Sequence, residues 1–110
     1  MKSSSAVASL EKKHGSWQIS GQLCANTVAR LAENGKQVIS EVQQDAQGTI
    51  CFDFADTEVQ DASAVAMLLE WIRFARYCKL HVTFMHLPHK LKIMAELGGV
   101  EAMIQQQIIE

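Results

Sequence analysis

The stretch Asp61-Ala62-Ser63-Ala64 joins a strand-like run, Thr49 to Phe54, to a long apolar segment from Val65 to Cys78. The spacing of apolar residues predicts that the second segment is a helix beginning next to the serine. The first N–H groups of a helix lack intrahelical partners and lie at the positive end of its dipole, so a phosphate or a partner's carboxylate is favoured there. Asp is also an ordinary helix cap. Two interpretations are therefore open for Asp61, Ala62 and Ser63: a plain cap, or a contact site.

The segments on either side of this helix predict two strands, each with one apolar face. Apolar side chains alternate with more polar ones in residues 50–54 and again in residues 80–85. Strands buried on both faces would be apolar throughout. The alternation therefore predicts a sheet covered by helices on one face, with a core that contains Ile50, Phe52, Phe54, Val82 and Phe84.

The order of the segments predicts parallel strands at the centre of this sheet. The turn-like residues Lys12–Gly15 separate two alternating runs, which predicts an opening hairpin. Asn26 is expected to cap a first helix, and Gly35 weakens its middle by about 1 kcal/mol relative to Ala, which favours a break there. Strand–helix–strand crossovers are right-handed and join parallel strands. An α/β fold follows, with one mixed sheet and helices packed mainly on one face.

The C-terminal part predicts further helical structure. Pro88 suits the first turn of a helix, and Gly98-Gly99 supplies its end. The tail from Val100 to Ile109 is expected to form a short terminal helix.

The predicted helix from Val65 to Cys78 has an apolar arc wider than contact with one sheet requires. A second sector, next to the one expected to face the sheet, either packs on a neighbouring helix or forms a partner-binding patch. In the second case its aromatic side chains would be the anchors, because aromatics dominate many interface hot spots. The contact residues expected from this sector are Met67, Trp71 and Phe74.

Several short sequence segments, in this order, resemble those of the STAS domain family. They are Asp61-Ala62-Ser63-Ala64, Met67-Leu68-Leu69-Glu70-Trp71, Leu80 to Pro88, and Ala95-Glu96-Leu97-Gly98-Gly99-Val100. Within the family, the chain looks most like the MlaB-like group, the small cytoplasmic subunits of the Mla phospholipid-transport ABC complexes of Gram-negative bacteria. The resemblance covers Trp17 to Ile104.

The resemblance implies a STAS fold and a non-enzymatic accessory protein. Such a protein would bind the ATPase subunit of an ABC transporter that moves phospholipids and maintains the lipid asymmetry of the outer membrane. It would support the assembly or the activity of this transporter. The alternative implied is an anti-sigma-factor antagonist regulated by serine phosphorylation. In that class the first hydroxyl residue after the Asp is phosphorylated, and this position is Ala62 here. Ser63 matches the second hydroxyl position and is the candidate for phosphorylation.

Composition favours one domain that does not bind nucleic acid or insert into a membrane. The chain of 110 residues, 48% of them hydrophobic, can bury one core, and residues 1–8 are expected to be flexible. A net charge of −2 gives no general attraction to nucleic acid or anionic lipid. No apolar run approaches the length of a membrane span. We expect a cytoplasmic protein, peripheral to the inner membrane through its partner, with its cysteines reduced.

No pattern of residues predicts a cofactor, a metal or an enzyme. His86 and His89 stand three residues apart but lack a paired set of Cys or carboxylate ligands. Gly98-Gly99 follows a helix, whereas a phosphate-binding loop precedes one. Ser63 with Asp61 lacks the positioned base that a nucleophilic triad needs. We therefore expect no metal, no cofactor and no catalytic residue.

Overall fold

The computed structural model describes residues 7–45 and 48–109. Residues 1–6, most of the segment predicted to be flexible, lie outside the described residues, whereas Ala8 already belongs to a strand. The elements are β1 (Ala8–Lys13), β2 (Ser16–Leu23), α1 (Ala25–Asp45), β3 (Thr49–Val59), α2 (Ser63–Tyr77), β4 (His81–Met85), α3 (His89–Leu97), α4 (Glu101–Gln105) and β5 (Ile108–Ile109).

The opening hairpin is confirmed, and its turn explains the pairing of β1 with β2. His14 and Gly15 have φ angles of 49° and 84°. Positive φ at both central residues is typical of the two-residue turns that match the twist of hairpin strands. Lys13 accordingly pairs with Ser16 in the antiparallel register.

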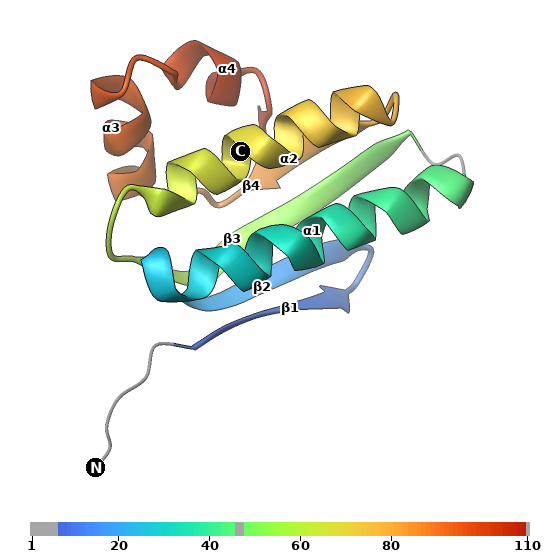
Figure 1. Ribbon diagram of the computed structural model, residues 1–110, viewed down its shortest axis with the longest axis horizontal. Coiled ribbons are helices and arrows are strands. Elements are labelled where there is room, and N and C mark those ends of the chain that lie inside the picture. The colour runs from blue at the N-terminus through green and yellow to red at the C-terminus, as the bar shows by residue number, and fades with distance from the viewer. Residues whose placement is uncertain (1–6, 46–47, 110) are drawn as a thin grey trace.

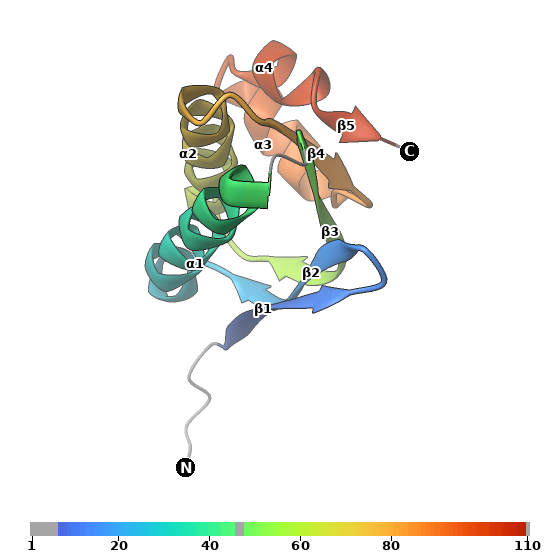
Figure 2. The ribbon, with the colours of Figure 1, turned by 90° about the vertical axis from the view of Figure 1, so that its right-hand side faces the viewer.

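The five strands form one sheet in the order β1-β2-β3-β4-β5, with β1 antiparallel and every other neighbouring pair parallel. Figures 1 and 2 show α1 and α2 side by side on one face of this sheet, with α3 and α4 beyond β4. The predicted α/β architecture, a mixed sheet with helices mainly on one face, is confirmed.

The predicted core positions are all buried, because alternate residues of β3 and β4 point toward the helices. None of their side chains is more than 3% exposed. The Phe52 ring stacks on Trp71 with a centroid distance of 4.4 Å, and Phe84 packs edge-on to Phe54 at 5.8 Å. The buried positions are Ile50, Phe52, Phe54, Val82 and Phe84.

The second apolar sector of α2 packs on α1, so the partner-patch interpretation is wrong for its two most buried members. Met67 and Trp71 have no exposed surface. The Trp71 Nε1–H donates a hydrogen bond of 3.0 Å to the carbonyl of Ala32. The indole ring lies against Gly35, and α1 continues through this residue without the predicted break.

The end of the chain differs from the prediction. Pro88 precedes α3, and Gly98 ends it, with Gly99 at a φ of 74°, as expected. The tail forms only the short helix α4 and then returns to the sheet as β5. There Phe84 N donates a 2.8 Å bond to the carbonyl of Gln107, so the sheet edge, rather than local helix propensity, decides this conformation.

Candidate partner-binding surface

The carboxylate of Asp61 ties together the first turns of α1 and α2, which start side by side in Figure 1. Its Oδ1 accepts hydrogen bonds from the backbone N–H of Ser63 at 2.9 Å and from the Ser63 hydroxyl. Its Oδ2 accepts one from the backbone N–H of Ala25 at 3.2 Å. One side chain thus satisfies N–H donors that two helix starts would otherwise leave unpaired.

The strands bring the two helix starts together. Gln60 N, just after β3, donates a 2.9 Å bond to the carbonyl of Leu23 at the end of β2. Thr27 then accepts a bond from Cys24 N at 3.1 Å, so the first turn of α1 is held by Thr27 and Asp61. The predicted Asn26 cap is wrong: Asn26 lies within α1.

The hydrogen bonds also favour the ionised form of Asp61. The Ser63 hydroxyl contributes most, followed by the N–H groups of Ser63 and Ala25, and together they hold the pKa of Asp61 below its ordinary value of 3.8. At neutral pH the carboxylate of Asp61, which is partly exposed, is therefore charged and bonded to both helix starts. Its role is to position Ala62 and Ser63.

The structure keeps part of the predicted contact set together, buries Met67 and Trp71, and places Phe74 apart from the others. Asp61, Ala62 and Ser63 adjoin at the start of α2, where Ala62 is exposed and Ser63 is half-buried. Phe74 lies half-buried at the other end of the helix, where its ring stacks on Tyr77 at 6.3 Å. We name Asp61, Ala62 and Ser63 the helix-start surface.

Sequence reasoning missed one residue of this surface. Ala25 shares the Asp61 carboxylate across 36 residues of chain, and no local pattern signals such a contact. Helix geometry places Tyr77 on the solvated side of α2 with Glu70 and Arg73, and the structure leaves Tyr77 83% exposed.

A second polar pair joins Asp53, in the middle of β3, to His86, the residue just after β4. Asp53 is largely buried, and its Oδ1 accepts bonds of 2.9 Å from both Ala55 N and His86 Nδ1. Burial raises the pKa of Asp53, but the bonds from His86 and Ala55 outweigh burial, so the pKa lies below its ordinary value.

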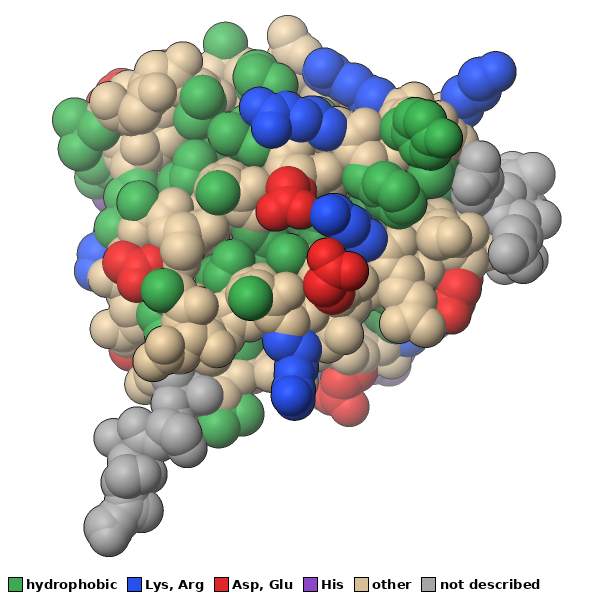
Figure 3. Space-filling view, viewed as in Figure 1, with side chains coloured by type: hydrophobic (Ala, Val, Ile, Leu, Met, Phe, Trp, Pro, Cys, Tyr) green, Lys and Arg blue, Asp and Glu red, His purple; other side chains and the backbone are tan. Residues whose placement is uncertain are grey.

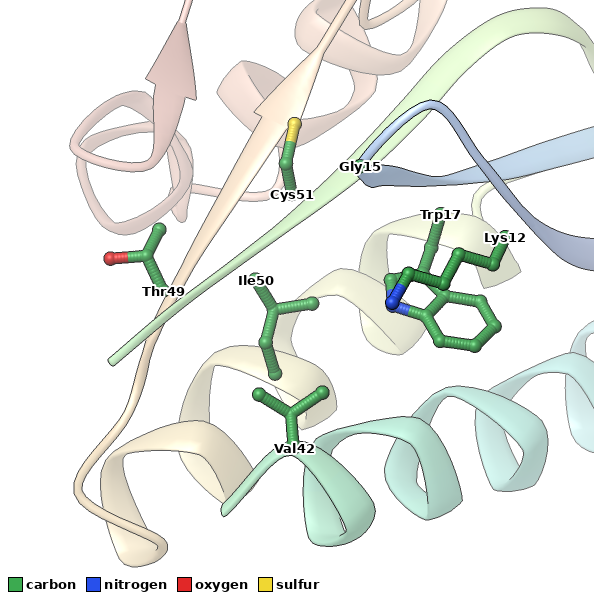
Figure 4. Close-up of a pocket in the computed structure, with 7 residues that line it drawn as sticks. All are labelled: Lys12, Gly15, Trp17, Val42, Thr49, Ile50 and Cys51. Atoms are coloured by element: carbon green, nitrogen blue, oxygen red, sulfur yellow. The ribbon is translucent and has the colours of Figure 1, made fainter. Parts of the chain in front are cut away.

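One pocket lies apart from the helix-start surface. It has a volume of about 370 Å³ and lies at the opposite end of α1, between that helix, the hairpin turn and the start of β3 (Figure 4). Lys12 Nζ lies 5.9 Å from the centre of the Trp17 ring in this pocket. Its lining residues are Lys12, Gly15, Trp17, Val42, Thr49, Ile50 and Cys51.

The described residues offer neither a metal site nor a membrane helix. Among the side chains that the structure describes, no three from His, Cys, Asp or Glu gather closely enough to hold a metal ion. Among the helices that the structure describes, none combines the length and the hydropathy that crossing a bilayer requires.

Comparison with known proteins assigns the fold. No protein-family model and no curated protein matches the chain. Among solved structures, the anti-sigma factor antagonist SpoIIAA in its unphosphorylated form matches with a TM-score of 0.59 and 17% identity, over 94% of this chain and 86% of that one. Phosphorylated SpoIIAA of Bacillus, a cell fate determinant, matches with a TM-score of 0.58 and 18% identity, over 94% and 89%.

The chain therefore has the fold of SpoIIAA, which is the STAS fold. The structural match establishes this architecture, whereas at 17–18% identity the more specific resemblance to the MlaB-like group stays a prediction.

Proposed function

We propose that this chain is a non-enzymatic regulatory protein that binds a partner protein through the helix-start surface. The observation that carries the proposal is the double cap made by Asp61, which holds Ser63 and the starts of two helices in one arrangement. A surface ordered before binding loses less conformational entropy when a partner docks. The small side chains of Ala62 and Ala66, both exposed, leave close approach open.

One candidate partner is an anti-sigma factor, the kind of protein that an anti-sigma-factor antagonist binds. The fold shared with SpoIIAA supports this class. Ser63 is then the site of control. A phosphate on the Ser63 hydroxyl would add a charge of about −1.5 to −2 beside the Asp61 carboxylate. It would also remove the O–H group that donates a hydrogen bond to that carboxylate. Phosphorylation would thereby break the bond between Ser63 and Asp61, and repulsion from Asp61 would oppose the attraction of the helix start for a phosphate. The rearranged surface would release the partner.

The second candidate partner is the ATPase subunit of a phospholipid ABC transporter. Two features of the sequence favour it. Ala62 occupies the position that carries the phosphorylated hydroxyl in anti-sigma-factor antagonists, and the words that resemble the MlaB-like group continue along α2. Binding of this kind would need no phosphorylation switch. The protein would work in the cytoplasm, peripheral to the inner membrane through the transporter, and it can bias the ATPase only by binding one of its states more tightly.

The experiment is a binding assay with each purified candidate partner. Wild type is compared with Ser63→Arg, and with Ser16→Arg as the matched control, because Ser16 is a half-buried serine in the hairpin at the far end of the sheet. Ser63→Arg should abolish binding while the melting temperature stays close to that of wild type, because a long side chain blocks approach at a half-exposed position. Ser16→Arg should bind normally.

The outcomes separate the candidates. Capture of the ATPase alone selects the transporter, and capture of the anti-sigma factor alone, lost on treatment with its kinase, selects the antagonist. If Ser63→Arg binds either partner at wild-type affinity, the helix start is only a cap and the proposed surface is wrong.

A further inference from the structure

The C-terminal half of α2 exposes a tyrosine among basic side chains. Tyr77 is 83% exposed, and its ring stacks on that of Phe74 with an angle of 22° between their planes. Figure 3 shows hydrophobic and basic side chains gathered over this half of the helix, at the upper right. We name this surface the aromatic–basic patch; it consists of Arg73, Phe74, Arg76, Tyr77 and Lys79, of which all but Phe74 are exposed.

The needs of the fold account for only part of this patch. A cation in the last turn of a helix interacts favourably with the helix dipole, which explains Arg76. Arg73 stands a turn earlier. Tyr77 leaves most of its ring in water, so it contributes little to the core. Neither Arg73 nor the exposed part of the Tyr77 ring is needed to cover the core, so both are available to a partner.

The charges of the patch are free to act on a partner. Lys36, in the middle of the neighbouring helix α1, forms ion pairs with Glu70 at 2.7 Å and with Glu33 at 3.7 Å. By contrast, no carboxylate on the side chains that the structure describes lies within ion-pair distance of Arg73, Arg76 or Lys79. The whole chain carries a net charge of −2, so this local excess of positive charge is not a property of the surface at large.

We infer that the aromatic–basic patch binds an acidic segment of the same partner protein that docks on the helix-start surface; the inference rests on the proposed function. Guanidinium groups pair with carboxylates through two parallel hydrogen bonds, and Tyr and Arg are enriched at the centres of interfaces. A partner segment that presents Asp or Glu next to an apolar side chain would satisfy both parts of the patch.

The two surfaces can belong to one interface. Ser63 and Tyr77 begin and end α2, and at 1.5 Å per residue they are separated by about 21 Å along the axis. Fourteen steps of about 100° bring Tyr77 back to within about 40° of Ser63 around the helix, so these two residues lie on the same side, with Arg73 about 80° and Arg76 about 140° from Ser63. A standard interface, with about 800 Å² buried on each partner, spans this distance.

The test reverses charge in the patch and leaves the helix start intact. The double variant Arg73→Glu with Arg76→Glu is compared with the double variant Lys12→Glu with Lys13→Glu, which makes the same change in net charge at two exposed lysines of β1. Tyr77→Ser removes the aromatic part of the patch. Affinity for the purified partner is measured at low and at high NaCl concentration, and each variant is checked for an unchanged melting temperature.

The expected result is a loss of affinity confined to the patch variants. The double reversal in the patch should weaken binding by about tenfold or more, and Tyr77→Ser by about fivefold or more, whereas the double reversal in β1 should stay within about twofold of wild type. Salt should weaken the binding of wild type more than that of the patch reversal, because the reversed patch no longer attracts the acidic segment. Tyr77 is the one tyrosine of the sequence, so its ring NMR signals should shift in the complex.

The outcomes distinguish failure of this inference from failure of the proposed function. Wild-type affinity in the patch reversal, together with loss of binding in Ser63→Arg, overturns the patch and leaves the helix-start surface in place. The opposite pattern supports the patch and overturns the helix start. If wild type binds neither candidate partner, both proposals fail. Binding of the patch to phosphatidylglycerol vesicles, with no effect of the variants on the partner, would make its ligand a membrane and would also overturn the inference.

Discussion

The indole ring of Trp71 occupies the space that a side chain on Gly35 would need. A Cβ at residue 35 would lie 2.2 Å from Cε2 of Trp71, and the ring has little room to move because it stacks on Phe52 at 4.4 Å and donates a hydrogen bond to Ala32. This close approach of α1 to α2 is the reason that a helix-weakening glycine stands in the middle of α1.

Gly35→Ala should therefore destabilise the protein although alanine is the better helix former. Overpacking costs about 1–3 kcal/mol, against a gain of about 1 kcal/mol in helix propensity, so we expect a net loss of up to about 2 kcal/mol in unfolding experiments. Gly98→Ala is the control, because its Cβ would meet its nearest neighbour, the Met94 carbonyl oxygen, at 3.5 Å. A more stable Gly35→Ala protein would mean that the two helices are not packed this closely.

Phe52→Ala should remove the centre of the core. The side chain has no exposed surface and lies between the rings of Trp71 and Phe84. Such a change costs about 3–5 kcal/mol, which denaturant unfolding measures directly. Tyr77→Ala, at an exposed ring, should stay within about 0.5 kcal/mol of wild type. A loss below about 1 kcal/mol for Phe52→Ala would contradict the assigned strand register.

The hydrogen bonds to Asp61 predict that the protein loses stability in acid. Because the folded pKa of Asp61 lies below its ordinary value of 3.8, the ionised carboxylate stabilises the fold above the unfolded pKa. This contribution is lost as the pH falls through the folded pKa. Melting temperatures of wild type and Asp61→Asn should therefore differ at neutral pH and converge in acid. A gap that stays constant with pH would contradict this role.

Ser63→Ala tests the cause of that pKa shift. The Ser63 hydroxyl is the largest contribution, so its removal should raise the pKa of Asp61 toward the ordinary value. The measurement is the titration of the Asp61 carboxyl signal by NMR. Ser16→Ala, which changes a serine in the hairpin, should leave that titration unchanged.

His86→Ala should raise the pKa of Asp53. Burial already disfavours the ionised carboxylate, and the variant removes the hydrogen bond that lowers the pKa of Asp53 most. Carboxyl NMR titration of Asp53 follows the change. His81→Ala, at an exposed position of β4, serves as the control. An unchanged titration in His86→Ala would assign the shift to the Ala55 N–H alone.

Residue periodicity was sufficient to predict the architecture. Alternation in Ile50, Phe52 and Phe54 depends only on which side of a strand each residue points to, and a one-sided apolar pattern has to be covered by helices. Pro88 and Gly98 likewise bound α3 through their own backbone preferences. These features depend only on residues that are neighbours in the sequence, so they can be predicted without the rest of the fold.

Contacts between distant segments were decided only by the tertiary structure. The apolar sector with Trp71 was equally compatible with a helix neighbour and with a partner, and the packing of α1 at Gly35 selected the neighbour. Asp61 caps two helices only because the fold brings it next to Ala25. The tail forms a strand only because it pairs with β4 at Phe84. Amino-acid patterns determine which surfaces are apolar or polar, whereas the choice of partner for each surface depends on which segments the folded chain brings together.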